Sequence, residues 1–288
     1  MSAMRGQRAG ESIRSLRMAA WLGWQIESNW ASPFLFAIYS VAKPVAGALI
    51  LVLMYTVIAQ GGLQNPLFPQ IFVGNAFYIY VAMVLMGVSQ AVTEDREHYG
   101  MLKYIYTAPL NIYTYLLGRG AAQAAMATVA VFIMLIFGII ALGIPLSPAS
   151  ISWGMLFAAW LFGLAGLAFG GVFLAGISLI TARHNFYIGE AMAGALYLMC
   201  GAVFPIDVLP RSLQFLSQAL PLTYWLEALR RALFGAGTGG LLSSLTDQML
   251  LLIVGGSMVL LAVISVVFYR WAENWARKRG LIDMQSMY

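Results

Sequence analysis

The sequence predicts an all-α integral membrane protein with six transmembrane helices. First, 61% of its 288 residues are hydrophobic and only 9% are charged, whereas a soluble domain carries about 25% charged residues. Second, its uncharged stretches are as long as the roughly 20 helical residues that a bilayer core requires, or longer. Transmembrane barrels alternate apolar and polar residues in segments of about ten. The apolar runs of this sequence are longer and continuous, so a barrel is not expected.

Glycine, proline and asparagine divide the apolar runs into individual spans. The breaks at 61–69 and 143–148 each separate two neighbouring spans. The predicted spans are approximately 36–59, 70–92, 115–142, 153–181, 186–204 and 247–269. Together they form a single transmembrane domain that covers residues 1–288.

The composition excludes several other classes of protein. The dominance of apolar residues excludes intrinsic disorder, and the single cysteine, Cys200, excludes a disulfide scaffold. The net charge of +5 comes from basic residues at the ends of apolar runs rather than from a clustered patch, so we expect no nucleic-acid partner. The expected surroundings are a lipid bilayer.

The distribution of Lys and Arg predicts the orientation. The loops 60–69 and 143–152 carry no charge, whereas both terminal segments are basic. The basic residues of those segments are Arg5, Arg8, Arg14, Arg17, Arg270, Arg277, Lys278 and Arg279. Because cytoplasmic segments are enriched in Lys and Arg, we expect both termini of this multi-pass protein on the cytoplasmic side of the cell membrane.

The N-terminal segment 11–31 is predicted to be an amphipathic helix along the cytoplasmic surface. Apolar residues recur in it at helical spacing, namely at Ile13, Leu16, Ala20 and Trp24. Trp21 and Trp30 also suit the headgroup level of a membrane, where tryptophan is enriched. The alternative is a frayed, basic anchor tail.

The chain has no pattern for a reactive or energy-supplying site. It contains no G-x-x-x-x-G-K-[ST] motif for nucleotide binding and no G-x-S-x-G motif. His98 and His184 lack the spacing of metal ligands. Lys43 and Glu190 lie near span ends, where interfacial anchoring is favoured over an ion site. We therefore expect no catalytic residue, metal or cofactor in this chain, and no self-powered pump.

The segment 93–109 holds the densest charge cluster of the sequence. Thr93 is predicted to cap a short helix whose first turn contains Glu94 and Asp95, and Pro109 is predicted to end it. Apolar and aromatic residues would share one face, at Tyr99, Leu102 and Tyr106. A rigid, charged element at the cytoplasmic surface favours docking of a soluble partner, and the alternative is a solvated turn.

The segment 204–235 is predicted to form a re-entrant helical hairpin on the outer side. Pro221 separates two amphipathic stretches that are too short to span a bilayer. In the second stretch Glu227 precedes Arg231 by four residues, a favourable helical pair. Two half-helices that enter the membrane must be buried against protein; the alternative is a hairpin lying flat on the outer leaflet.

These segments resemble the membrane subunit of an ABC-2 type transporter, the permease of an ATP-binding-cassette exporter. The resemblance extends over nearly the whole chain and rests on E-D-R-E-H-Y-G-M-L-K-Y-I-Y-T-A-P at 94–109, F-P-I-D-V-L-P at 204–210 and L-P-L-T-Y-W-L-E-A-L-R-R at 220–231. It implies a permease dimer, homomeric or heteromeric, that binds two copies of a separate ATPase subunit, in which ATP and Mg would act.

The resemblance also implies roles for individual residues. A coupling helix that docks into the ATPase would use Glu94, Asp95, Arg96, Glu97, Tyr99 and Gly100. An outer gate would be shaped by Phe204, Pro205, Asp207, Pro210, Pro221, Glu227 and Arg231.

The substrate class is the least constrained inference. A path with few charges favours a hydrophobic or amphiphilic drug or lipid, and its candidate lining is Phe77, Tyr80, Met83, Tyr197 and Met199, for which ordinary helix packing is the alternative. The resemblance implies export by alternating access, with a lipid-linked polysaccharide as the alternative substrate. An ATP-independent channel or secondary transporter and a structural scaffold are further alternatives. A glycine face at 163, 166 and 170 favours close helix packing within the chain, and a dimer seam is the alternative.

Overall fold

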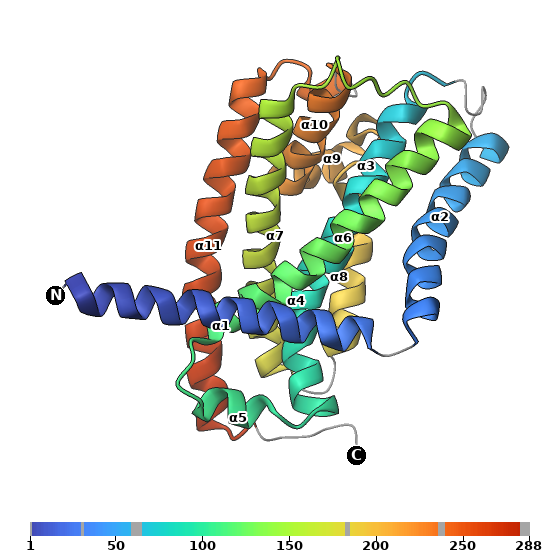
Figure 1. Cartoon of the computed structure of the whole chain (residues 1–288). Coiled ribbons are helices and arrows are strands. Elements are labelled where there is room, and N and C mark those ends of the chain that lie inside the picture. The colour runs from blue at the N-terminus through green and yellow to red at the C-terminus, as the bar shows by residue number, and fades with distance from the viewer. Residues whose placement is uncertain (1, 30–31, 59–64, 182–184, 236–239, 283–288) are drawn as a thin grey trace.

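The computed structural model describes residues 2–29, 32–58, 65–181, 185–235 and 240–282. For residues 2–10 and 185–188 it describes the backbone alone. Most of the described residues are helical, and none of them lies in a strand. Figure 1 shows a bundle of long helices that run side by side, with one helix, α1, lying across them. We call the two ends of the bundle the α5 end and the α10 end after the short helices found there.

Five helices of the described chain are long and apolar enough to cross a membrane. They are α2 (Pro33–Ile58), the continuous helix Phe68–His98, α6 (Ile112–Leu142), α7 (Trp153–Ile180) and α11 (Asp247–Lys278). They correspond to the predicted spans 36–59, 70–92, 115–142, 153–181 and 247–269. The all-α membrane fold is therefore confirmed.

The predicted span 186–204 is a shorter helix in the structure. α8 (Asn185–Met199) has 15 residues, so it rises about 22 Å, less than the roughly 30 Å of a bilayer core. A turn with a left-handed glycine, Gly201, ends it. The count of six spans stays a prediction.

The second span contains two π-helical turns. It consists of α3 (Phe68–Tyr80), η2 (Val81–Leu85), α4 (Met86–Thr93) and η3 (Glu94–His98), without a break. The prediction that Thr93 caps a separate helix is therefore wrong, because Thr93 is the last residue of α4 and has helical backbone angles. The charged residues extend the transmembrane helix, since neighbouring helices supply partners for them, as described below.

A glycine corner separates η3 from α5. Gly100 has a φ of 59°, in the left-handed region that favours glycine, and the six-residue α5 (Leu102–Thr107) follows. The predicted single helix over 93–109 is thus two pieces, with the charges on the first and an aromatic, mostly exposed surface on the second.

Helix α1 (Ser2–Ser28) packs across α6 through small residues. A Cβ atom at Gly118 of α6 would lie 2.6 Å from the Ala19 Cβ and 2.7 Å from the Leu16 carbonyl oxygen. The predicted helix at 11–31 is therefore present but begins earlier, and positions 30–31 fall outside the described residues. Its exposed side carries Ile13 and Trp21, apolar residues that suit a membrane surface.

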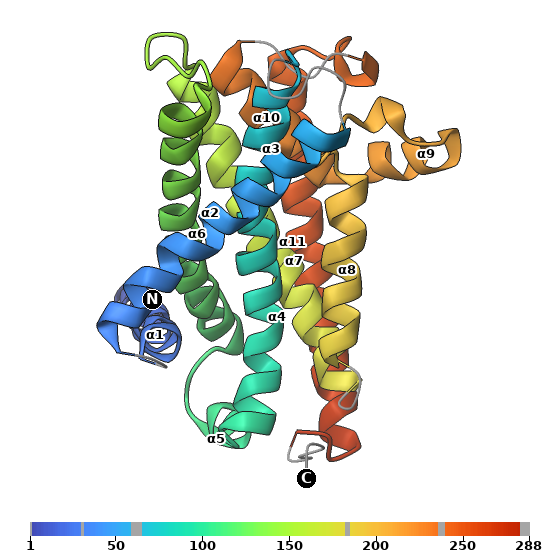
Figure 2. The same ribbon diagram turned by 90° about the vertical axis from the view of Figure 1, so that its right-hand side faces the viewer.

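The hairpin at the α10 end consists of η4 (Ile206–Val208), α9 (Arg211–Ala219) and α10 (Pro221–Phe234), followed by η5 (Gly240–Leu242). Figure 2 shows α9 at the edge of the molecule, beyond the upper end of α8, and α10 among the long helices. Trp225 of α10 is buried and its indole N–H donates to the Ala159 carbonyl of α7 at 2.8 Å. Depth in a membrane is not defined by these contacts, so re-entrance stays a prediction.

Two of the three positions of the predicted glycine face of α7, Gly163 and Gly170, pack against neighbours within the chain, whereas Gly166 does not. A Cβ atom at Gly163 would lie 1.8 Å from the Trp225 Nε1, and one at Gly170 would lie 2.7 Å from the Leu85 Cδ1. The absent side chains therefore leave room for neighbours from α10 and η2.

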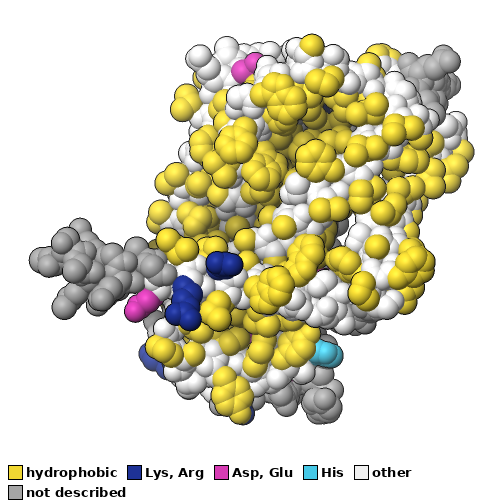
Figure 3. All heavy atoms as spheres, in the orientation of Figure 1, with side chains coloured by type: hydrophobic (Ala, Val, Ile, Leu, Met, Phe, Trp, Pro, Cys, Tyr) yellow, Lys and Arg dark blue, Asp and Glu magenta, His cyan; other side chains and the backbone are white. Residues whose placement is uncertain are grey.

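The outside of the bundle is largely apolar. Figure 3 shows hydrophobic side chains along its length, whereas most of the charged side chains in view lie near α1, towards the α5 end. Large apolar residues are exposed on each of the outer helices, for example Val57 on α2, Ile140 on α6 and Leu252 on α11. A surface of this kind needs the hydrocarbon of a membrane around it.

Candidate functional site

A buried charge cluster connects η3 with α6 at the α5 end. It comprises Glu94, Asp95, Tyr115 and Arg119. The Arg119 guanidinium donates from Nη1 to the Asp95 Oδ1 at 3.1 Å and from Nη2 to the Glu94 Oε2 at 2.9 Å. The Tyr115 hydroxyl donates to the other Asp95 oxygen at 2.8 Å. Asp95 is fully buried and Arg119 is 3% exposed, so this arrangement supplies the partners that buried charges require.

Helix α1 is attached to the same part of α6. One turn beyond Arg119, the Gln123 amide donates to the Glu27 Oε1 of α1 at 2.7 Å. Together with the small-residue contact at Gly118, this bond holds α1, α6 and η3 as one connected unit.

A second buried pair connects η3 with α7. Arg96 donates from Nε to the Glu97 Oε1 at 2.9 Å and from Nη1 to the Ser178 carbonyl oxygen at 3.2 Å. The side chains of Arg96 and Glu97 are 1% and 3% exposed. The π-helical turn η3 is therefore held by two different transmembrane helices, α6 and α7.

The structure separates the predicted docking residues into two groups. Asp95, Arg96 and Glu97 are buried, so they set the position of the turn. Glu94 is partly exposed and Tyr99 is 45% exposed. Their docking to a partner stays a prediction.

The exposed surface of this region lies mainly on and around α5. We call it the α5 surface, and it is formed by His98, Tyr99, Lys103, Tyr104, Thr107 and Leu110. Tyr106, on the inner side of α5, holds this surface against the bundle: its hydroxyl lies 2.8 Å from that of Tyr269 on α11. Burial raises the pKa of Tyr106 further above its ordinary value, so the pH at which its hydroxyl would ionise moves further above neutrality.

Sequence patterns missed Tyr115, Arg119 and Ser178 as members of this site. One signal for Arg119 is available in the sequence: it is the only charged residue of α6. A charge within a transmembrane segment usually faces the protein interior and pairs with another charge.

A second buried cluster lies in the α10 hairpin. Glu227 is 1% exposed and accepts from the Arg231 Nε at 3.3 Å. Arg231 also donates to the Leu242 and Leu245 carbonyl oxygens, at 2.7 and 2.6 Å. These bonds attach α10 to the segment that leads into α11.

Arg230 is buried on the same helix, on the other flank of Glu227, whose Oε2 lies 4.0 Å from the Arg230 Nη1. Its Nε donates to the Gln70 carbonyl oxygen at 2.9 Å, and its Nη2 donates to the Gly201 carbonyl oxygen. Gly74 of α3 makes room for it, because a Cβ atom there would lie 1.9 Å from Nη2. Sequence analysis did not single out Arg230, although it stands beside the predicted Arg231.

The other predicted gate residues lie at the ends of the short helices of the hairpin or in the segments between them. Asp207 accepts from the Leu241 backbone N–H at 2.9 Å. Pro205 and Pro210 directly precede η4 and α9, and Pro221 is the first residue of α10. Phe204 is partly buried. The structure brings Glu227 and Arg231 together, whereas Asp207 binds a different segment; none of these contacts tests a gating role.

A family model describes most of this architecture. The model of the ABC-2 type transporter matches residues 18–234, which include both buried clusters. The chain belongs to the ABC-2 type transporter family. A comparison with curated proteins gives no match.

As an ABC-2 permease, the chain is a membrane component of a transporter, and such permeases associate in general with an ATP-binding subunit. The resemblance inferred from the three sequence runs is therefore confirmed. Among the described residues of this ABC-2 permease, no group of three or more His, Cys, Asp or Glu side chains is placed to hold a metal ion.

The candidate path residues of this ABC-2 permease are packed to different degrees. Phe77 and Tyr80 are buried in the core, and the Tyr80 hydroxyl donates to the Thr128 Oγ1 at 2.9 Å. Tyr197 is partly buried and donates to the Asn75 Oδ1 at 2.8 Å. Met83 and Met199 are also partly buried. Their part in a substrate path stays a prediction.

Proposed function

We propose that this chain is the permease subunit of an ABC exporter, which moves a hydrophobic or amphiphilic substrate outward. One observation carries the proposal: Arg119 joins η3, and so the base of α5, to a long transmembrane helix through a buried ion pair with Asp95 and a partly exposed one with Glu94. A push on the α5 surface would therefore reach the membrane-spanning part of the protein without passing through a flexible loop.

The α5 end is the cytoplasmic end in this proposal. Exposed basic residues gather there, on α1, on α5 and on the last turns of α11: Arg14, Arg17, Lys103, Arg270, Arg277, Lys278 and Arg279. Enrichment of Lys and Arg in short segments beside spans favours a cytoplasmic location. Both termini then lie inside the cell, and the α10 hairpin faces out.

The partner is a separate ATPase that binds the α5 surface. That surface offers two exposed aromatic side chains, Tyr99 and Tyr104, and the charge of Lys103. Aromatic anchors of this kind dominate the energetics of protein interfaces. Two ATPase copies would act on a permease dimer, and ATP and Mg would be bound by the ATPase.

Transport proceeds by alternating access in this proposal. Closure of the ATPase dimer displaces α5 and η3, and the displacement passes to α6 through Arg119 and to α7 through Arg96. Helix α1 moves with α6, because Glu27 and Gln123 join them. The scarcity of charged residues in the spans favours a hydrophobic or amphiphilic substrate. A glycan needs accessible aromatic faces, and Phe77 and Tyr80 are buried.

Co-purification tests this function. Tagged full-length chain, purified from its native membranes, is expected to carry an ATP-hydrolysing subunit in equal amount. Tyr104→Glu, on the α5 surface, should release that subunit. Phe215→Glu, at an equally exposed aromatic position on α9, should retain it. Transport by the purified chain alone in liposomes, or external labelling of a cysteine placed at position 104, would contradict the proposal.

A further inference from the structure

The bundle contains an apolar pocket bounded by α7, α8, α10 and α11. Its volume is about 360 Å³. The lining residues that matter here are Gly166 of α7, Met192 of α8, Leu222 and Trp225 of α10, and Met258 and Leu261 of α11. The pocket lies within one chain and shares no residue with the predicted substrate path.

The pocket exists because Gly166 of α7 has no side chain and no neighbouring helix fills the space beside it. At Gly163 and Gly170 the room is taken by Trp225 and Leu85. At Gly166, by contrast, an added Cβ atom would meet only the Met258 Cβ, at 3.9 Å. The neighbouring helices therefore leave this part of α7 uncovered.

The chemistry of the walls selects an uncharged, apolar occupant. No charged side chain lines the pocket. Its one hydroxyl, on Ser257, already donates to the Val254 carbonyl oxygen at 2.8 Å. A water molecule needs two to four polar partners, and a sugar would leave its hydroxyls without partners at a large cost.

The surroundings of the pocket indicate where the occupant comes from. Met192 is 38% exposed, and α7 and α11 are both long, apolar helices, so hydrocarbon is expected to surround this level of the bundle. On α11, Met258 and Leu261 are followed at helical spacing by Ile264, Phe268 and Trp271. The stripe from Met258 to Trp271 is about 20 Å long.

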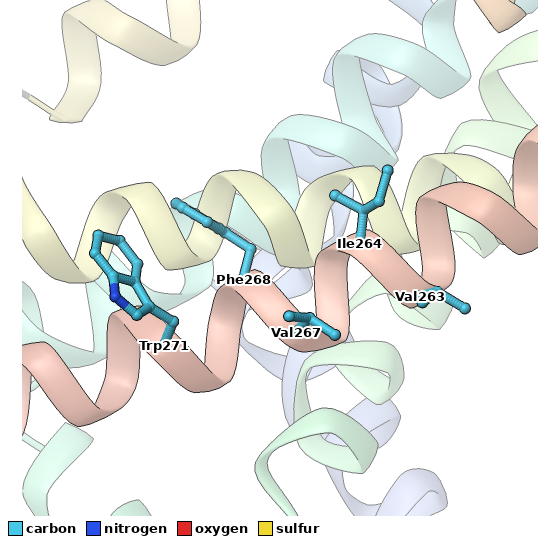
Figure 4. A pocket seen from close by; sticks show the side chains of 5 residues that line it. All are labelled: Val263, Ile264, Val267, Phe268 and Trp271. Atoms are coloured by element: carbon cyan, nitrogen blue, oxygen red, sulfur yellow. The ribbon is translucent and has the colours of Figure 1, made fainter.

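The lower part of this stripe is an open apolar depression. It is lined by Val263, Ile264, Val267, Phe268 and Trp271. Figure 4 shows Ile264, Phe268 and Trp271 leaning towards the neighbouring helix, and the Phe268 ring lies 4.5 Å from that of Phe173 on α7. The half-open pocket thus leads, along one face of α11, towards a surface that would contact lipid chains.

We propose that this pocket binds one acyl chain of a bilayer phospholipid, whose headgroup stays outside the protein. The acyl chain enters beside Met192 and lies along α11, between Gly166 of α7 and Trp225 of α10. This inference does not depend on transport or on the ATPase.

Photolabelling of the full-length chain in nanodiscs tests the proposal. The probe is a phosphatidylethanolamine with a diazirine in the middle of one acyl chain. Peptides that contain Met192 and Met258 should be labelled several-fold more strongly than the exposed face of α2 around Leu53, which reports ordinary lipid contact. Equal labelling of the two regions overturns the proposal.

Two variants and one control make the test specific. Gly166→Leu fills the pocket and should reduce pocket labelling to the level of α2. Gly154→Leu makes the same change on the same helix, where no atom lies within 4 Å of the new Cβ, and should leave labelling unchanged. If Gly166→Leu does not fold, Met192→Trp blocks the entrance from an exposed position. Unchanged pocket labelling in the blocking variant contradicts the proposal.

A second copy of the chain is the competing occupant. Met192→Cys in a Cys200→Ala background should form no disulfide between copies if lipid fills the pocket. Cross-linked copies together with absent lipid labelling would assign the pocket to a protein interface and overturn the proposal.

Discussion

Arg119 of α6 and Asp95 of η3 form an ion pair of 3.1 Å that is sealed from solvent on both sides. The pair joins residues 24 positions apart and fixes where the charged end of the second span meets the third. Because neither charge has water available, each depends on the other and on Tyr115 for its solvation.

Replacement of Arg119 should destabilise the protein strongly. Arg119→Met leaves the Asp95 carboxylate buried beside a neutral hydroxyl, which costs about 3–5 kcal/mol in comparable sites. We expect a large drop in the midpoint of thermal unfolding in detergent. Adding Asp95→Asn should recover part of the loss, whereas Arg277→Met, which breaks an exposed pair with Glu273, should change stability by about 0–1 kcal/mol. Equal effects of Arg119→Met and Arg277→Met would contradict the assigned burial.

The double variant Glu94→Ala and Glu97→Ala should uncouple ATP hydrolysis from transport. It removes the Glu94 bond to Arg119 of α6 and the Glu97 carboxylate that orients Arg96, whose guanidinium donates to the Ser178 carbonyl of α7. The attachment of η3 to both helices is therefore weakened. The number of substrate molecules moved per ATP hydrolysed, measured in proteoliposomes with the ATPase, is expected to fall while hydrolysis continues. Wild-type coupling in this variant would defeat the proposed transmission route.

Gly100→Ala should weaken ATPase binding more than it lowers stability. The left-handed backbone at Gly100 costs an alanine about 1–2 kcal/mol, and relief of that strain would reorient α5. Affinity for the ATPase should fall about tenfold or more, as measured by titration of the two purified subunits. Gly47→Ala, in a helical position with open space around it, is the matched control. A normal affinity with Gly100→Ala would show that the corner does not position the α5 surface.

Gly163→Ala should destabilise the bundle, whereas Gly154→Ala on the same helix should not. The new methyl group at 163 would overlap the Trp225 ring, and overpacking of this kind costs about 1–3 kcal/mol. At 154 the space is open, and alanine is the better helix former, by less than the roughly 1 kcal/mol of a helix interior because 154 lies in the first turn of α7. Thermal unfolding of the two variants in the same detergent should therefore shift in opposite directions.

The long spans could be predicted from the sequence because bilayer thickness translates directly into an uncharged run of fixed length. The existence of the N-terminal helix and of the break at Pro221 followed from equally local signals. The end of the second span did not, because Thr93, Glu94 and Asp95 form a plausible helix start when only neighbours in sequence are considered. Partners distant in sequence, Arg119 and Ser178, decide the outcome.

The same reasoning explains what was missed at the candidate site. A run of charged residues beside a span predicts a solvated, partner-binding face, yet Asp95, Arg96 and Glu97 are buried. Whether a charge is exposed depends on what packs over it, and α6 and α7 reach η3 only in the folded bundle. Arg230 was overlooked for the same reason, since its acceptors are carbonyl oxygens of other elements.

The two π-helical turns of the second span bear on how it can move. Each π turn accommodates one residue more than an α-helical turn would, and one residue corresponds to about 100° of rotation around the axis. If η2 returned to α-helical geometry, everything beyond it would swivel while α3 stayed seated against α10. The carboxylates of η3 would then rotate about the axis of the span, and α6, which is bound to them through Arg119, would be displaced with them.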